Sequence, residues 1–316
     1  MRSLKLNEII CIVILSSFMI LAILGYLITP DRTRYCNTQL PEIAFLNPLS
    51  KACFAKNYLQ PFESSVDAIT GIQHYERPVL VENESPAKSC HLFILGTDRF
   101  GRDLLSRLII GTRYTLLIAF FAVLFAVIIG VTLGSLSGYF GGRTDRAINF
   151  AIGVFWSLPS ILFAFVIVLA AGKNIGALFV SIGITIWADM AKLVRGLVMV
   201  QKECNYVRSA TALGFSPSRI LFIEILPNIS GPILVQASSN FALAILLESG
   251  LSFMGLGLQP PIPTLGNIMQ DQYTQAFNGQ IIQSLIPAIV LVLLILSFQI
   301  VANTVRDRID VKLSRD

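Results

Sequence analysis

Six apolar runs, each long enough to cross a lipid bilayer, constrain this chain more than any other feature. A helix needs about 20 residues to cross about 30 Å of hydrocarbon. Apolar residues dominate six stretches of that length, at 9–29, 113–138, 147–171, 175–199, 229–250 and 282–303. Only 14% of the residues are charged, against about 25% in a soluble domain. The pattern predicts an all-α integral membrane protein with six transmembrane helices.

The positive charges predict which way these spans run, because Lys and Arg are retained on the cytoplasmic side. The loop at 251–281 contains neither residue type. The arginines between 99 and 113 lie in or after a long first loop, and long loops translocate largely regardless of charge. The remaining basic residues near the spans share one side if both termini are cytoplasmic: Arg2, Lys5, Arg143, Arg146, Lys202, Arg208, Arg219, Arg306, Arg308, Lys312 and Arg315. The net charge of +5 is then a matter of topology and does not indicate nucleic-acid binding.

Composition divides the chain into four parts. Residues 1–29 form a membrane anchor, because the apolar stretch is longer than that of a signal peptide and no small-residue cleavage site follows it. Residues 30–111 form an outer insert and an amphipathic segment before the second span, 112–308 hold five spans and a loop at 200–228, and 309–316 form a cytoplasmic tail. The outer loop holds Cys36, Cys53 and Cys90, which allows either one disulfide with a thiol left over or three unpaired thiols.

Polar residues in the fifth apolar run fall on one helical face. Steps of four align Gln236, Asn240 and Glu248. Such a face either makes interhelical hydrogen bonds or lines a polar pathway, and both interpretations stay open. Gln236, Ser239 and Asn240 are the candidate pathway residues. The pattern does not require Glu248 to be buried, because near the outer end of the span its carboxylate can reach headgroups or water.

Two further features of the spans have local explanations. Asp189 and Lys192 are one helical turn apart, with Arg195 on the next turn, so we expect them to pair along their own helix or to reach the membrane surface. Pro159 is expected to kink the third span.

No arrangement of residues predicts catalysis or metal binding. The two histidines, His74 and His91, both lie in the outer loop, which excludes a zinc-protease motif and an intramembrane Ser/His pair. Residues 96–103, "GTDRFGRD", have the glycine spacing of a phosphate-binding loop but lack its Lys-Ser/Thr ending and lie on the outer side. We therefore expect no catalytic, cofactor or metal site in this chain, and an energy source in another chain or an ion gradient.

The loop at 200–228 is too structured for a simple connector. A short helix from Tyr206 ends at Gly214, which suits a left-handed C-terminal cap, and Ser216 with Pro217 begins a second helix that runs to Ile225. Connections between helices are usually shorter than this. Two short helices at a fixed bend predict a rigid projection that docks on a partner.

These residues resemble the cytoplasmic loop of permease subunits in bacterial ABC importers. Ala210, Gly214 and the run Ile225-Leu226-Pro227 match that family's pattern of Glu-Ala-Ala, Gly and Ile-x-Leu-Pro. Four other segments are similar, in order and spacing, to the second permease of the peptide and nickel importers: "LGTDRFGRDLLSRLIIGTR", "LSGYFGG", "KLVRG" and "ESGLSFMGLGLQPPIPTLGNI". The resemblance extends from about residue 95 to residue 308.

The resemblance implies a type I ABC importer permease fold with a cytoplasmic coupling helix, in the bacterial inner membrane. Implied partners are a homologous permease, two ATPases that bind ATP and Mg, an external solute-binding protein and membrane lipid, with no nucleic acid. The residues implied to dock on the ATPase are Tyr206, Arg208, Ser209, Ala210, Leu213, Gly214, Phe215 and Pro227. The outer insert is expected to touch the binding protein or the partner permease.

One residue departs from the family pattern. Arg208 stands where the family has an acidic residue, and Glu203, five residues earlier, is not in register to replace it. Either the ATPase presents a compensating acidic residue, or docking depends on shape alone. Peptides are the first substrate expected and nickel or a nickel chelate the second. An ion-coupled secondary transporter and an outer-domain receptor or assembly protein are the alternatives from other classes, but no internal repeat supports the first.

Overall fold

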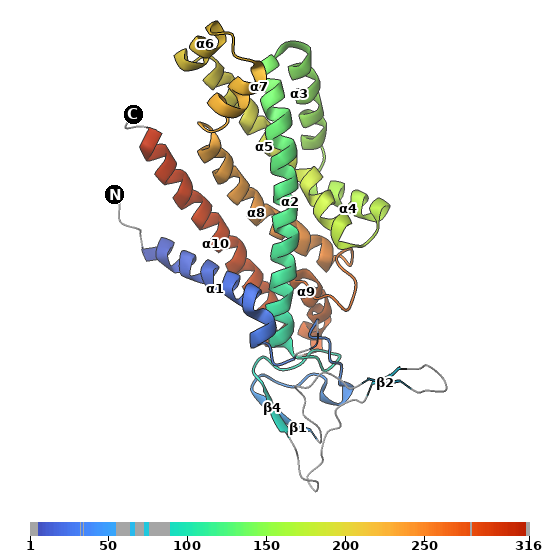
Figure 1. Ribbon diagram of the computed structural model, residues 1–316. Helices are drawn as coiled ribbons and strands as arrows, with labels where there is room; N and C mark the ends of the chain where they lie inside the picture. The colour runs from blue at the N-terminus through green and yellow to red at the C-terminus, as the bar shows by residue number, and fades with distance from the viewer. Residues whose placement is uncertain are drawn as a thin grey trace. The chain divides into compact units, whose positions relative to one another are not determined.

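The computed structural model of the chain is largely helical (Figure 1) and describes residues 6–31, 33, 35–54, 64–66, 73–75, 89–278 and 280–313. Arg2, Lys5 and Arg315 and most of the insert between 55 and 88 lie outside the described residues. The elements in chain order are α1 (Leu6–Ile28), η1 (Pro41–Ile43), β1 (Ser50–Phe54), β2 (Ser64–Val66), β3 (Gln73–Tyr75), β4 (Ser89–Phe93), α2 (Leu104–Phe140), α3 (Gly142–Trp156), α4 (Ser160–Ala171), α5 (Ile175–Lys202), α6 (Asn205–Ala212), α7 (Pro217–Arg219), η2 (Ile220–Ile225), α8 (Ser230–Phe253), α9 (Leu265–Tyr273), η3 (Thr274–Asn278) and α10 (Ile281–Leu313).

Within the part of the chain that the structure describes, five single helices are long and apolar enough to cross a membrane: α1, α2, α5, α8 and α10. The pair α3 and α4 makes a sixth span if it is counted as one, but it is bent by 93°. The expected third span, a single kinked helix over 147–171, is therefore wrong in detail. Pro159 is the N-cap of α4, with φ −58° and ψ 124°. A proline disfavours helical geometry in the residue before it, so the helix is interrupted between α3 and α4 instead of kinking.

The chain divides into two compact units, which are described separately here. Unit 1 comprises residues 1–16, 116–251 and 292–316, and unit 2 comprises residues 17–115 and 252–291. Four long helices, α1, α2, α8 and α10, each contribute residues to both units.

Close packing of α2 against α5 forms the centre of unit 1. Gly130, Gly134 and Gly138 recur at steps of four and present one bare face of α2. A Cβ on Gly134 would lie 2.5 Å from the carbonyl oxygen of Ala191, and one on Gly130 would lie 2.6 Å from Cβ of Met190. Small residues at this spacing let helix backbones approach closely in a membrane. The glycines therefore hold α2 and α5 together as one body.

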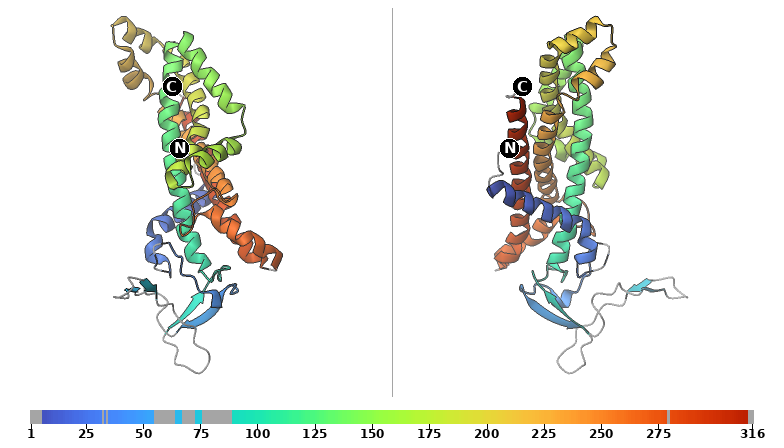
Figure 2. Two further views of the ribbon diagram at one scale, coloured as in Figure 1. Left: turned by 90° about the vertical axis from the view of Figure 1, so that its right-hand side faces the viewer. Right: turned by 60° about the vertical axis from the view of Figure 1, so that its left-hand side comes forward.

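The loop at 200–228 folds as predicted, with α6 followed by α7 and the π-helical turn η2. Both further views agree with Figure 1 in placing α6 and α7 at the end of unit 1 where α2 turns into α3 (Figure 2). The basic residues of these connections, among them Arg143 and Arg219, consequently gather at one end of unit 1, as the charge pattern predicts.

Unit 2 contains the described part of the outer insert. Strands β1 and β4 pair antiparallel, and the Cys53–Cys90 disulfide links them. Cys36 is the thiol left over; burial, with the nearby Asp31 carboxylate, raises its pKa to about 12. The side chains of Leu40, Ile43, Ala52, Phe54 and Phe93 form a buried cluster within the insert. Backbone hydrogen bonds join the 40–46 segment to residues 97–100.

We predict that Gly134→Ala destabilises unit 1, because its methyl group meets the carbonyl of Ala191 across the α2–α5 interface. Overpacking of this kind costs about 1–3 kcal/mol, and thermal unfolding in detergent should show the loss. Gly196→Ala on α5 is the matched control, since a Cβ there meets nothing within 4 Å. Equal stability of the two variants would contradict the packing described here.

Candidate functional site

Local hydrogen bonds set the bend between α6 and α7. Gly214 has φ +77°, its N–H donates to the carbonyl of Thr211, and the N–H of Phe215 donates to that of Ala210. These two bonds form a Schellman motif, in which a glycine in the left-handed region is favoured. Ser216 then caps α7 by accepting from the N–H of Arg219 at 3.4 Å. The predicted caps are thus both present.

The inner face of this segment is apolar and buried in unit 1. The buried cluster joins α5, α6 and η2, with partly buried side chains of α2 and α8 against it: Met190, Val194, Val198, Val207, Ala210, Ile220, Leu221, Ile225 and Ile229. Ala210, predicted as a docking residue, therefore packs the segment against the helices. Buried side chains from both elements therefore connect the segment directly to α5.

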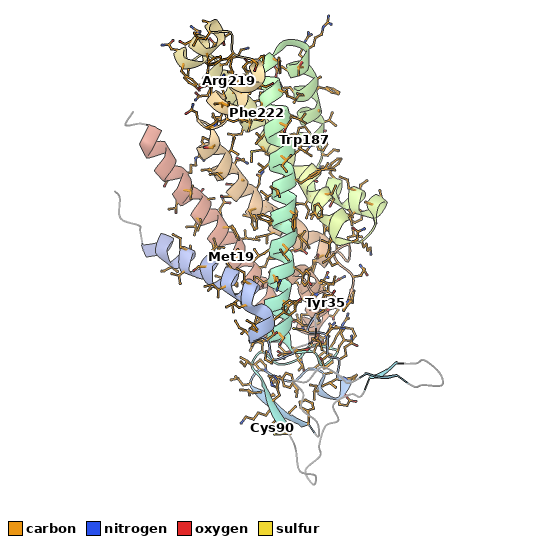
Figure 3. All side chains as sticks on the ribbon, in the orientation of Figure 1. Met19, Tyr35, Cys90, Trp187, Arg219 and Phe222 are labelled. Carbon is orange, nitrogen blue, oxygen red and sulfur yellow. A yellow bond between two sulfur atoms is a disulfide. The ribbon has the colours of Figure 1, made fainter. Side chains whose placement is uncertain are left out.

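The outer face of the same segment carries large exposed side chains. Leu213, Phe222 and Ile223 are exposed, and Figure 3 shows Phe222 and Arg219 at this end of unit 1. The guanidinium of Arg219 lies 4.0 Å from the ring of Phe215. Ser209 and Pro227 are also exposed, and the hydroxyl of Tyr206 donates to Gln201 at 2.6 Å. Exposed apolar patches of this kind mark interaction surfaces.

Arg208 forms an ion pair with Glu203 at 2.5 Å, and both side chains are largely exposed, at 64% and 72%. Five residues would not align them on one continuous helix. The helix is interrupted by a turn between α5 and α6, however, and this turn brings the two side chains together. An exposed pair contributes only about 0–1 kcal/mol, so Arg208 can exchange Glu203 for another acidic partner.

The polar face of α8 is largely buried within the protein. Gln236 Nε2 donates to Asn240 Oδ1 at 2.9 Å, while Asn240, at 2% exposure, has no hydrogen-bond partner for Nδ2 among the described residues. Ser239 is partly buried. Glu248 is completely buried and accepts from Ser249 Oγ at 3.3 Å. Burial of Glu248 was not predicted from its place near the end of the span.

The charged residues of α5 pair with α3, so the expected pairing along α5 is wrong. Arg195 binds both carboxylate oxygens of Asp145, at 2.5 and 2.8 Å. Trp156 donates to Asp189 at 2.8 Å, and Lys192 donates to Asn149 Oδ1 at 3.3 Å. Asp145 was not predicted to be a partner of Arg195, because 50 residues separate the two in sequence. The sequence signal that could have pointed to Asp145 was its position in the first turn of the short helix α3.

The "GTDRFGRD" segment forms a buried ion cluster in unit 2. Asp98 Oδ2 accepts from Arg102 Nε and from Arg107 Nη1, both at 2.6 Å. Asp271 of α9 accepts from Arg99, Arg102 and Arg107 at 2.9, 2.9 and 3.2 Å. Burial lowers the pKa of the Arg102 guanidinium, and the neighbouring Arg107 adds to the shift.

The glycines of this segment have a structural explanation. Gly101 has φ +70°, and a Cβ there would lie 1.8 Å from the carbonyl oxygen of Leu40. The phosphate-loop spacing thus reflects tight turns that the insert backbone approaches closely. Among the described residues, no group of three or more His, Cys, Asp or Glu side chains could hold a metal ion. The expectation that the chain binds no metal or cofactor stays a prediction.

Comparison with known proteins supplies the family. The dipeptide transport system permease protein DppC of Lactococcus lactis is 35% identical over 224 residues, which is 71% of this chain and 65% of that protein. The glutathione transport system permease protein GsiD of Pectobacterium atrosepticum is 34% identical over 85% of each chain, and the oligopeptide permease OppC of Bacillus subtilis is 33% identical over 76% of this chain and 78% of its own.

A solved structure shares the fold. A chain of the MetNI methionine ABC transporter in an inward-facing conformation aligns with a TM-score of 0.54 and 19% identity, over 65% of this chain and 97% of that one. Residues 130–315 match the model of the family described as "Binding-protein-dependent transport system inner membrane component". The chain therefore belongs to this family and is a multi-pass inner membrane permease of an ABC importer, a transport component and not itself an enzyme.

Proposed function

We propose that this chain forms half of the translocation pathway of an ABC importer for peptides. It pairs with a homologous permease, two ATPases that bind ATP and Mg, and an external solute-binding protein that delivers the substrate. Both termini lie in the cytoplasm, which places the 200–228 loop on the side of the ATPases and the 251–281 loop outside. The names of the relatives reported above support peptides over nickel.

One observation carries this proposal: the 200–228 loop is buried on one face and exposed on the other. Its inner side chains are packed against α5, with residues of α2 and α8 around them. Its outer face presents Leu213, Phe222 and Ile223. A surface that a partner can bind is thereby fixed rigidly to the helix that carries the polar face, α8.

The mechanism follows from this rigid connection. Closure of the ATPases on ATP displaces the docked segment, and the segment carries α5 and α8 with it because the apolar cluster does not deform. The pathway beside Gln236, Ser239 and Asn240 on α8 then changes from inward facing to outward facing. The amide of Asn240 suits this role. Its Oδ1 accepts from Gln236 within the helix, while its buried Nδ2 has no partner among the described residues and would donate to a substrate carbonyl once the helices move.

The substrate class is tested with the whole complex in proteoliposomes, with the binding protein added outside. We expect uptake of labelled di- and oligopeptides that requires ATP and the binding protein, and no accumulation of Ni²⁺ added alone or as a chelate. Nickel uptake in the absence of peptide uptake would reverse the assignment.

Arg208 is predicted to take an acidic partner on the ATPase. Arg208→Glu should uncouple ATP hydrolysis from uptake, and reversing the charge of one acidic ATPase residue should restore coupling, because docking would bury part of this exposed cation and so require a counter-charge. Glu203→Gln is the matched control: it removes the internal ion pair, costs little stability and should leave coupling intact. Unchanged coupling in Arg208→Glu would mean that docking depends on shape alone.

Gly214→Val is predicted to weaken assembly of the complex, and no charge reversal on the ATPase should rescue it, since a side chain there strains the left-handed cap.

Gln236 and Asn240 are predicted to face the pathway. Leu at either position should lower the uptake rate per folded complex while thermal stability changes little. The hydrogen bond that is lost lies within α8, and even a hydrogen bond between helices in a bilayer contributes only about 0.6 kcal/mol. Ser238→Ala is the control on the same helix, because Ser238 Oγ bonds the carbonyl of Leu234 one turn earlier. A drop in stability with normal uptake per folded complex would assign these side chains to packing.

A further inference from the structure

A carboxylate and an ammonium lie in the middle of the membrane-spanning helix α5. Asp189 is roughly 20 Å along the helix axis from either end of α5, and Lys192 follows one turn later. Arg195 pairs with Asp145, whereas neither Asp189 nor Lys192 makes an ion pair with a residue that the structure describes. Charged side chains inside a membrane span are costly and usually mark the pathway of a substrate or an ion.

Neutral groups of α3 hold both of these charges. Trp156 Nε1 donates to Asp189 Oδ1 at 2.8 Å, and Lys192 Nζ donates to Asn149 Oδ1 at 3.3 Å. Lys192 Nζ also lies 5.8 Å from the centroid of the Trp156 ring, which is within the range of a cation–π contact. An indole and an amide satisfy hydrogen bonds but bring no opposite charge. Each of the two charges therefore favours a ligand group of opposite sign.

The three side chains are accessible from outside the chain. Trp156 is 54% exposed, Lys192 is exposed and Asp189 is half-buried. Hydrocarbon cannot compensate charges at this depth, so lipid is a poor cover for this face. The face is instead expected to border water or a polar molecule, as the wall of a translocation pathway does.

The surroundings of Asp189 favour an ammonium as the group that binds there. Of the aromatic side chains, an indole attracts cations most strongly, and the ring of Trp156 already lies beside the ammonium of Lys192. Helix α3 ends at Trp156, at the bend that separates it from α4 (Figure 1). The C-terminal end of a helix also favours positive charge.

The spacing of the two charges indicates the ligand. Side chains three residues apart on a helix have Cβ atoms about 5–6 Å apart, and the ends of an extended dipeptide are at most about 7 Å apart. We propose that this face of α3 and α5 binds the two charged termini of a short peptide. The ammonium terminus binds Asp189 and the Trp156 ring, and the carboxylate terminus binds Lys192. The inference rests on the proposed function and narrows its substrate to short peptides with both termini free.

Photolabelling of the whole complex in nanodiscs tests the site directly. The probe is a dipeptide with free termini and a diazirine in its second side chain, and mass spectrometry locates the labelled residues. We expect labelling within 149–156 and 189–196. An excess of unlabelled dipeptide should abolish it, whereas the same dipeptide with an acetylated amine and an amidated carboxyl group should not compete.

Asp189→Asn and Lys192→Met should each lower this labelling by about tenfold or more, because each removes the counter-charge of one terminus. Asn at position 189 still accepts a hydrogen bond from Trp156, so thermal unfolding should match that of the unaltered complex. Glu203→Gln is the matched control, since it removes an exposed carboxylate at the C-terminal cap of the same helix. Labelling of this control should not change.

Three results would overturn the proposal. The first is labelling of Asp189→Asn no lower than that of Glu203→Gln. The second is equal competition by the free and the blocked dipeptide, and the third is labelling confined to other segments. Failure of the proposed function is separable, because it appears as absent ATP-driven peptide uptake by the unaltered complex with its binding protein, wherever the probe is found.

Discussion

Apolar packing of the 200–228 loop against α5 is the interaction on which the proposed transport mechanism depends. Val207, Ile220 and Ile225 are buried beneath a loop whose opposite face is exposed. If the loop were joined to α5 and α8 only at its two ends, those two connections could bend, and a displacement of the loop surface would not have to move the helices. Because its interior is continuous with the helix packing, a displacement at the surface must also move the helices. The left-handed cap at Gly214 serves the same end, since it fixes the angle between the two buried faces.

Helix α5 owes its position to two unlike kinds of contact. On one side the bare glycine face of α2 allows backbone approach, and on another Arg195 pairs with Asp145 of α3. Van der Waals contact between helices is the main attraction available in lipid, where hydrophobic burial offers no advantage. The ion pair adds a directional contact near the end of the helix. Together they join α2, α3 and α5 with the loop, which is the rigid connection that the proposed mechanism requires.

Sequence reasoning succeeded where a feature is local and failed where it depends on tertiary structure. The caps at Gly214 and Ser216 follow from the conformations that these residues favour, and the spans follow from length and apolar character. The Asp145–Arg195 pair joins different helices, and the Arg208–Glu203 pair spans the turn between α5 and α6, so neither follows from a helical repeat. Cysteine spacing left the disulfide open, whereas the β1–β4 register sets Cys53 opposite Cys90. The role of Arg107 likewise required Asp271, which lies 164 residues away.

Asp98 and Asn240, two buried polar residues, differ in how fully their hydrogen-bonding groups are satisfied, and the difference bears on the proposed function. Asp98 accepts from two backbone N–H groups and two guanidinium groups, which is close to the full capacity of a carboxylate. Asn240 keeps an amide nitrogen unpaired among the described residues. A carboxylate bonded in this way resists change, because any movement breaks several charged hydrogen bonds. An incompletely bonded amide loses little when it exchanges one neighbour for another. In the proposed complex, the first arrangement suits a fixed surface on the side of the binding protein, and the second suits the proposed pathway, which a solute must both enter and leave.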